Sequence, residues 1–113
     1  MKLVAIAATV AALAVPSALA GTPKLVGTVG PGFTITVTQN GKKVKTLKAG
    51  TYVITVKDRS AFHNFRLKGP GVNKKTSVSK QGTTTWKVTL TKGTYRYVCD
   101  PHKTIMKGSF KVV

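Results

Sequence analysis

The chain has few acidic residues, few histidines and a single cysteine. Its 113 residues include two acids, Asp58 and Asp100, two histidines, His63 and His102, and the cysteine Cys99, against 19 lysines and arginines. One cysteine excludes an internal disulfide, and an unpaired thiol is prone to oxidation or intermolecular pairing in an oxidising compartment. A metal ion bound to the sulfur would protect it and would also stabilise the folded state.

The chain also lacks an apolar run of the about 20 residues that a membrane-spanning helix needs. Its long apolar run, Leu3 to Val15, follows Lys2 and precedes Ala18-Leu19-Ala20, which places small residues at the positions that determine cleavage. This order is typical of a secretory signal peptide. We therefore predict a leader over residues 1–20 and one domain over residues 21–113, exported to the periplasm, the cell envelope or the extracellular space.

Acidic residues are too few to balance the basic ones. Removal of Lys2 with the leader leaves 18 basic residues and two acids, a net charge of +16. Such a charge attracts anionic partners, and the resulting association rates fall as ionic strength rises. One alternative is that the lysines keep a secreted domain soluble, and another is association with an anionic membrane or wall surface. Nucleic acid is not an expected partner, because most aromatic residues fall at inward strand positions and leave no platform for stacking bases.

No segment after residue 21 has a convincing helical pattern. Apolar and polar residues alternate instead, with Gly, Pro and Asn at the breaks, and Asn40-Gly41 indicates a tight hairpin. We predict an all-β fold, an antiparallel Greek-key sandwich of seven or eight short strands. The segment 72–81 is the least regular part. The expected strands cover residues 33–37, 42–47, 52–56, 62–67, 86–90, 95–99 and 110–112.

The alternation also predicts which side chains face the core. In the expected strand 62–67, His63 faces inward and Asn64 and Arg66 face outward. Cys99 continues the inward face of a later strand, so that His63 and the sulfur can meet at one end of the core. The other residues expected to face inward are Phe33, Ile35, Val37, Phe65, Leu67, Trp86, Val88, Leu90, Tyr95, Tyr97, Phe110 and Val112.

Three metal donors lie within eight residues, from Cys99 to Met106. A thiolate, the imidazole of His102 and a thioether together suit copper, because the sulfur ligands favour the cuprous ion and imidazole accepts either oxidation state. Zinc ligands are normally cysteine, histidine and carboxylates rather than methionine. A His₂Cys site needs a second histidine, and His63 is the one other histidine of the chain.

Each of these residues also has an ordinary structural interpretation. His63 alone could be a core histidine with satisfied hydrogen bonds, Met106 a filler of the core, and Cys99 a small buried hydrophobic residue. The combination of both histidines, the one cysteine and a methionine in this order and phase favours a metal site.

These residues resemble the cupredoxins, the type 1 blue-copper proteins of the plastocyanin and pseudoazurin kind. The resemblance is carried by residues 58–72, which contain Phe62-His63-Asn64-Phe65, and by residues 93–113, in which Cys-x2-His is followed closely by methionine. It implies a cupredoxin fold with one copper ion, cycling between Cu(II) and Cu(I), in a plane formed by His63, Cys99 and His102. It further implies that Met106 is a weak axial ligand.

The resemblance also implies roles for neighbouring residues. Asn64 is expected to link the two ligand-bearing segments, and His102 to transfer electrons through an apolar patch. Asp100 stands where the family usually has a small or neutral residue, and it could brace the loop by accepting amide hydrogen bonds. The three residues between His102 and Met106 differ from the spacing in plastocyanin and amicyanin. The expected patch consists of Pro31, Ala61, Pro101 and Ile105.

The function implied is that of an exported one-electron carrier, a monomer steered by its charge to an acidic redox protein. No enzymatic reaction is expected, because the protein fills all four coordination positions. The alternative is a copper-binding protein for storage, delivery or tolerance of copper in the cell envelope.

Overall fold

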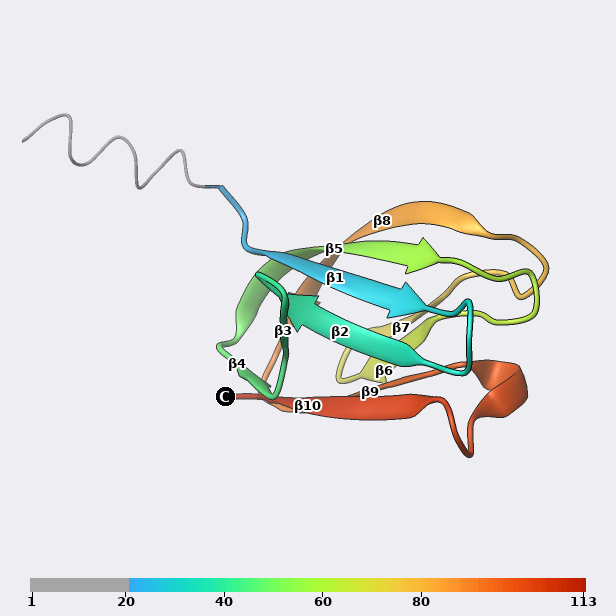
Figure 1. Cartoon of the computed structure of the whole chain (residues 1–113). Helices are drawn as coiled ribbons and strands as arrows, with labels where there is room; N and C mark the ends of the chain where they lie inside the picture. The colour runs from blue at the N-terminus through green and yellow to red at the C-terminus, as the bar shows by residue number, and fades with distance from the viewer. Residues whose placement is uncertain (1–20) are drawn as a thin grey trace, which may run out of the picture.

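The computed structural model describes residues 21–113, which form ten strands and one short 3₁₀ helix in two layers (Figure 1). The predicted signal peptide lies outside the described residues. Within residues 21–113, no helix has the length and apolar character needed to cross a membrane. The elements are β1 (Lys24–Val29), β2 (Ile35–Gln39), β3 (Lys42–Lys43), β4 (Thr46–Leu47), β5 (Gly50–Asp58), β6 (Arg66–Gly69), β7 (Val72–Lys75), β8 (Gly82–Leu90), β9 (Gly93–Val98), η1 (Asp100–His102) and β10 (Lys107–Val112).

The strands form two five-stranded sheets, which confirms the predicted all-β sandwich. One sheet has the order β3-β2-β1-β5-β8 and the other β4-β10-β9-β6-β7. Most neighbours are antiparallel, but β1 pairs with β5 and β4 pairs with β10 in parallel. Side-chain alternation does not encode strand direction, so these two pairings were not predicted. The strand expected over residues 42–47 divides because β3 pairs with β2 whereas β4 pairs across to β10 in the other sheet.

The core lies between the two sheets and contains the side chains that the alternation predicts. Tyr52, Ile54 and Val56 of β5 are buried, as are Tyr95 and Tyr97 of β9. Aromatic rings fill the centre of the second sheet, where the ring of Tyr97 stacks on that of Phe65 and the ring of Tyr95 on that of Phe110, at centroid distances of 6.0 and 5.6 Å. Strand β9 therefore carries an inward-facing row that ends at the fully buried Cys99.

Three expectations about residues in the predicted strands are wrong. Phe33 does not face the core but is 62% exposed, because β2 begins only at Ile35 and the preceding turn is not bound by strand alternation. The segment 62–65 is not strand, since β6 begins at Arg66. His63 and Phe65 are nevertheless buried as expected, whereas Asn64, expected to face outward, is 1% exposed. Hydrogen bonds to other segments, described below, determine its position.

Close packing of Tyr97 requires the absence of a side chain at residue 108. Gly108 of β10 is the cross-strand partner of Tyr97 of β9, and a Cβ built on Gly108 would overlap the ring of Tyr97. Tyr97 is itself fully buried and cannot move outward. Gly108 thus lets the aromatic row of β9 pack against β10.

We predict that Gly108→Ala lowers the free energy of unfolding by about 1–3 kcal/mol, the usual range for overpacking a core. Urea denaturation of the apoprotein measures the effect. Gly32→Ala is the matched control, because a Cβ at Gly32 has no atom within 4 Å. Equal stability of the two variants would contradict the packing argument.

Candidate metal centre

The predicted metal ligands meet at the end of the sandwich where η1 lies. His63 comes from the segment between β5 and β6, Cys99 follows β9, His102 ends η1, and Met106 precedes β10. Backbone hydrogen bonds close the ligand loop: Met106 N–H donates to the carbonyl of His102 at 2.8 Å, and Cys99 N–H donates to the carbonyl of Met106 at 3.1 Å. The loop therefore holds its three donors on a fixed backbone.

Three of the predicted donor atoms converge on one point. The Sγ of Cys99 lies 3.7 Å from Nδ1 of His63 and 3.6 Å from Nδ1 of His102, and the two Nδ1 atoms are 3.2 Å apart. Bonds of about 2.0 Å to nitrogen and about 2.3 Å to sulfur, at angles of about 105–120°, give separations of about 3.2–3.8 Å between ligands of one ion. The observed distances therefore fit a trigonal His₂Cys site, the cluster of metal-binding side chains that the described residues contain.

Burial separates the donors from water to different degrees. Cys99, Met106 and His63 are at most 3% exposed, whereas His102 is partly exposed. The side chains of Met106, Cys99 and His63 are thus shielded from water. A soft sulfur pair with two imidazoles in a dry environment suits copper.

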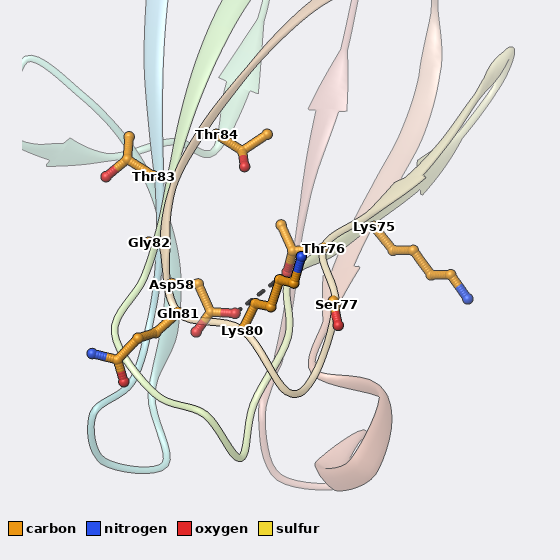
Figure 2. Close-up of a pocket in the computed structure, with 9 residues that line it drawn as sticks. All are labelled: Asp58, Lys75, Thr76, Ser77, Lys80, Gln81, Gly82, Thr83 and Thr84. Carbon is orange, nitrogen blue, oxygen red and sulfur yellow. Dashed lines mark hydrogen bonds between the residues drawn. The ribbon is translucent and has the colours of Figure 1, made fainter.

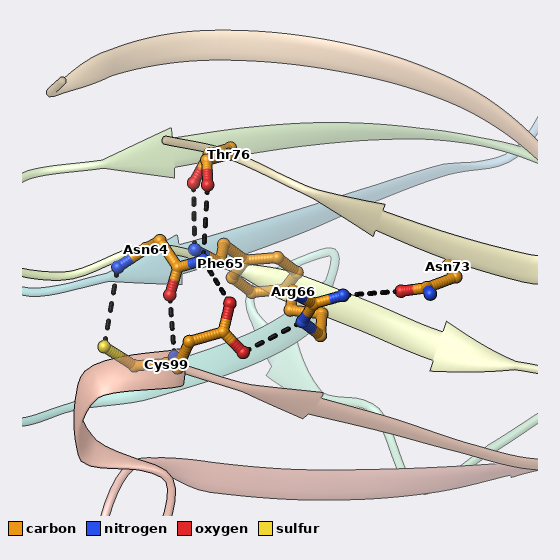
Figure 3. Close-up of polar contacts among 7 residues, drawn as sticks. Asn64, Phe65, Arg66, Asn73, Thr76 and Cys99 are labelled. Atoms are coloured by element: carbon orange, nitrogen blue, oxygen red, sulfur yellow. Dashed lines mark hydrogen bonds and ion pairs between the residues drawn. The ribbon is translucent and has the colours of Figure 1, made fainter. Parts of the chain in front are cut away.

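Asn64 links the two segments that carry the ligands (Figure 3). Its backbone N–H points to the Sγ of Cys99 at 3.4 Å, and its side-chain oxygen accepts a hydrogen bond of 2.7 Å from the N–H of Asp100. Its side-chain nitrogen donates to Asp100 Oδ2 at 2.8 Å and to the carbonyl of Thr76 at 3.2 Å. The expected role of Asn64 as a link between the segments is therefore confirmed.

Asp100 is the second residue of this link, and it accepts hydrogen bonds as its position suggested. Arg66 Nε donates to Asp100 Oδ1 at 2.8 Å, and Arg66 Nη1 donates to Asn73 Oδ1 at 2.8 Å. The hydrogen bond from Arg66, aided by that from the Asn64 amide, holds the pKa of Asp100 below its ordinary value. The carboxylate is thus ionised and fixed beside Cys99.

Asp58, at the end of β5, supports the His63 segment through Ser60 and Thr76. Its Oδ1 accepts the N–H of Ser60 at 3.1 Å, and its Oδ2 accepts a 3.4 Å hydrogen bond from the hydroxyl of Thr76, drawn in Figure 2. The same hydroxyl oxygen accepts the N–H of Phe65 at 2.9 Å. Burial raises the pKa of Asp58, against the lowering effect of these hydrogen bonds.

Exposed apolar side chains surround the metal end. The ring of Phe33 packs edge to face against the rings of both His63 and His102, at centroid distances of 5.4 and 5.1 Å. Phe62 and Ile105 are 77% and 63% exposed. The other residues of the expected patch, Pro31, Ala61 and Pro101, are exposed as well.

Reasoning from the sequence missed the roles of several residues at this end of the molecule. Alternation places Phe33 in the core, and the expected patch omits the exposed Phe62. The contact of Arg66 with Asp100 joins residues 34 positions apart, and that of Thr76 with Asp58 joins residues 18 apart. Sequence alternation carries no information on such pairs.

Comparison with known proteins agrees with this geometry. Residues 28–113 match the copper-binding proteins of the plastocyanin/azurin family. The chain is similar to reduced rusticyanin, with 26% identity, a TM-score of 0.56, and coverage of 80% of this chain and 78% of that one. Rusticyanin from Thiobacillus ferrooxidans gives 28% identity, a TM-score of 0.55, and coverage of 80% and 76%.

Auracyanin A, a "blue" copper protein from Chloroflexus aurantiacus, shares the fold, with 21% identity, a TM-score of 0.56, and coverage of 82% of this chain and 100% of that one. No curated protein sequence matches the chain.

We predict that Asn64→Ala lowers the free energy of unfolding by about 1–3 kcal/mol, because it leaves the N–H of Asp100 without its acceptor. The variant should also bind copper more weakly, since the two ligand segments are no longer joined. Urea denaturation of the apoprotein and a copper titration measure the two effects. Asn73→Ala is the control: it removes one exposed hydrogen bond to Arg66 and should leave both quantities nearly unchanged.

Proposed function

Because this chain belongs to the plastocyanin/azurin family of copper-binding proteins, we propose that it is a one-electron carrier between redox proteins. It has one type 1 copper site, formed by His63, Cys99, His102 and Met106. The family consists of small electron carriers rather than enzymes. The observation that carries the proposal is the convergence of the three ligand atoms on one point.

The ligands have distinct roles in this proposal. His63, Cys99 and His102 form the plane of the site, and Met106 is the weak axial ligand. Copper supplies the exchange of one electron between its cupric and cuprous states. The protein holds the ligands in nearly the same positions for both states, because the ligand loop and the Asn64 link fix their backbone. A fixed site needs little reorganisation when its charge changes.

Electrons reach the site through the apolar end of the molecule. His102 is the ligand with partial exposure, and the ring of Phe33 packs against its ring. Phe62, next to His63, and Ile105, in the ligand loop, add exposed apolar surface that water leaves readily on contact. A partner that packs against this surface excludes water between the two redox centres. The apolar end is thus the proposed port for electron exchange.

We further propose that the protein is exported as a monomer and that its partner is acidic. The apolar run before Ala20 supports export, and the net charge of +17 for the whole chain supports an anionic partner. Storage or delivery of copper is the competing function. A carrier exchanges electrons rapidly and retains its metal, whereas a delivery protein releases cuprous copper to an acceptor, so copper transfer to a cuprous chelator distinguishes them.

We predict that the mature protein turns intensely blue with cupric salt, through charge transfer from the thiolate of Cys99 to copper. Cys99→Ser should abolish the colour, because serine provides no thiolate. Visible absorption spectroscopy checks this, with circular dichroism to confirm that the variant is folded. A colourless, weakly bound copper complex of the native chain would contradict the site.

We predict that Phe62→Ser slows electron self-exchange about tenfold, because loss of an exposed aromatic residue at an interface weakens contact by about 1.4 kcal/mol or more. NMR line broadening in mixtures of oxidised and reduced protein measures the rate. Val113→Ser is the control, since Val113 is 64% exposed but lies at the opposite end of the sandwich (Figure 1). A larger effect of the control would remove the apolar end from the proposal.

A further inference from the structure

The outer face of the sheet β4-β10-β9-β6-β7 carries a concentration of positive charge. Its outward positions hold six cations on four adjacent strands, and we call this surface the basic face. Five of the six are exposed and Arg66 is partly buried. The basic face consists of Arg66, Lys68, Lys75, Arg96, Lys107 and Lys111.

The strand register places like charges directly opposite one another. Arg66 is the cross-strand partner of Lys75, and Lys68 that of Arg96. Like charges in such pairs destabilise a sheet. Across residues 21–113, the ion pair of Arg66 with Asp100 is the one that forms, and the other five cations of the basic face have no carboxylate in contact, although Asp100 attracts Lys75. The sheet therefore accumulates repulsion that an anionic ligand would relieve.

Solubility of the strands does not require this charge. The outer face of the other sheet, which we call the threonine face, is composed mainly of threonine, and its lysines are Lys24, Lys43, Lys57 and Lys87. The two sheets of one chain thus use different residues at equivalent outward positions. The threonines are Thr28, Thr36, Thr38, Thr51, Thr55, Thr83, Thr85 and Thr89.

Two shallow hollows in the basic face have the composition of carboxylate sites. Arg96 and Val98 line both of them. The first also has Arg66 and Lys68 at its border, and the second has Lys107 and Ser109. An arginine can bind a carboxylate through two parallel hydrogen bonds, which makes Arg96 an anchor common to both hollows.

We propose that the basic face docks an acidic protein, whose aspartate or glutamate side chains enter the two hollows beside Arg96. The proposal rests on the electron-carrier function for the identity of that protein as a redox partner. Val98, between Arg66 and Lys107 in the register, immediately precedes Cys99. A protein on the basic face therefore lies along the strand that leads into Cys99 at the metal end, where the proposed apolar port lies.

The form of the basic face favours a protein over a lipid surface. Hollows between strands accept individual side chains, whereas a membrane presents a broad layer of headgroups. Membrane-bound surfaces commonly insert apolar residues. The exposed large apolar side chains of the described residues are Phe33, Phe62, Val78, Ile105 and Val113, and none belongs to the basic face.

The test compares two triple variants with the same loss of charge. One removes cations from the basic face (Lys68→Gln, Arg96→Gln, Lys111→Gln), and the control removes them from the threonine face (Lys24→Gln, Lys57→Gln, Lys87→Gln). The probes are poly-L-glutamate for binding and a ferredoxin with an acidic surface as electron donor. We expect the basic-face variant to bind poly-L-glutamate at least about tenfold more weakly and to accept electrons about tenfold more slowly, with less than about twofold change in the control.

Each result decides the proposal. Equal losses in both variants would show that net charge alone acts, and would overturn it. If the basic-face variant loses binding to phosphatidylglycerol vesicles but retains binding to poly-L-glutamate, the proposal is overturned in favour of a membrane. Reduction by a small uncharged reagent should be the same in all three proteins. If the native protein exchanges electrons with no donor, the proposed function fails, while binding to poly-L-glutamate still decides the basic face.

Discussion

The structure depends on one constraint: two segments 36 residues apart in the sequence must hold a histidine and a thiolate within bonding distance of one ion. Asn64 meets this constraint with both its backbone and its side chain, because its N–H points to the sulfur and its amide pairs with Asp100 in both directions. These hydrogen bonds tie Asn64, the residue after His63, to Cys99 and to Asp100, the residue after Cys99. The protein thus sets the positions of the metal-ligand atoms before any ion binds, and a bound copper ion adopts the geometry that they impose.

Two surfaces of the molecule, the metal end and the basic face, differ in their physical properties. The metal end is apolar, and water leaves it easily when a partner approaches. In our proposal the basic face attracts an acidic partner before contact, because Coulomb forces act over a Debye length of about 8 Å at physiological ionic strength. Arg66 belongs to both regions, since its guanidinium lies in the basic face and its Nε binds the Asp100 carboxylate next to Cys99.

Much of the fold and of the site could be predicted from the sequence, for identifiable reasons. Burial has a period of two in strands, so the alternation of β5, β8, β9 and β10 showed the core directly, and the inward phase of Cys99 followed. Where the chain leaves regular strand, alternation fails: Phe33 packs on the histidine rings instead of in the core, and Asn64 is buried by its hydrogen bonds. The parallel pairings depend on how the chain crosses between sheets, which no local pattern records. The signal peptide, the location and the partners stay predictions.

Because the chain has one cysteine and no internal disulfide, a bound metal ion can serve as the cross-link of the fold, and the fold in turn positions the metal ligands. A domain of this size has a modest core, and small domains often need an additional cross-link. An ion bound to His63 and Cys99 joins the segment before β6 to the end of β9. Because it binds the native state more tightly than the unfolded chain, it adds stability that rises with the logarithm of its affinity. In return, the buried aromatic rows of β9 hold Cys99 in a fixed position with its sulfur in the core. The single cysteine is then protected and functional at once, because the same bond that shields the thiolate from oxidation makes it a ligand of the type 1 copper site.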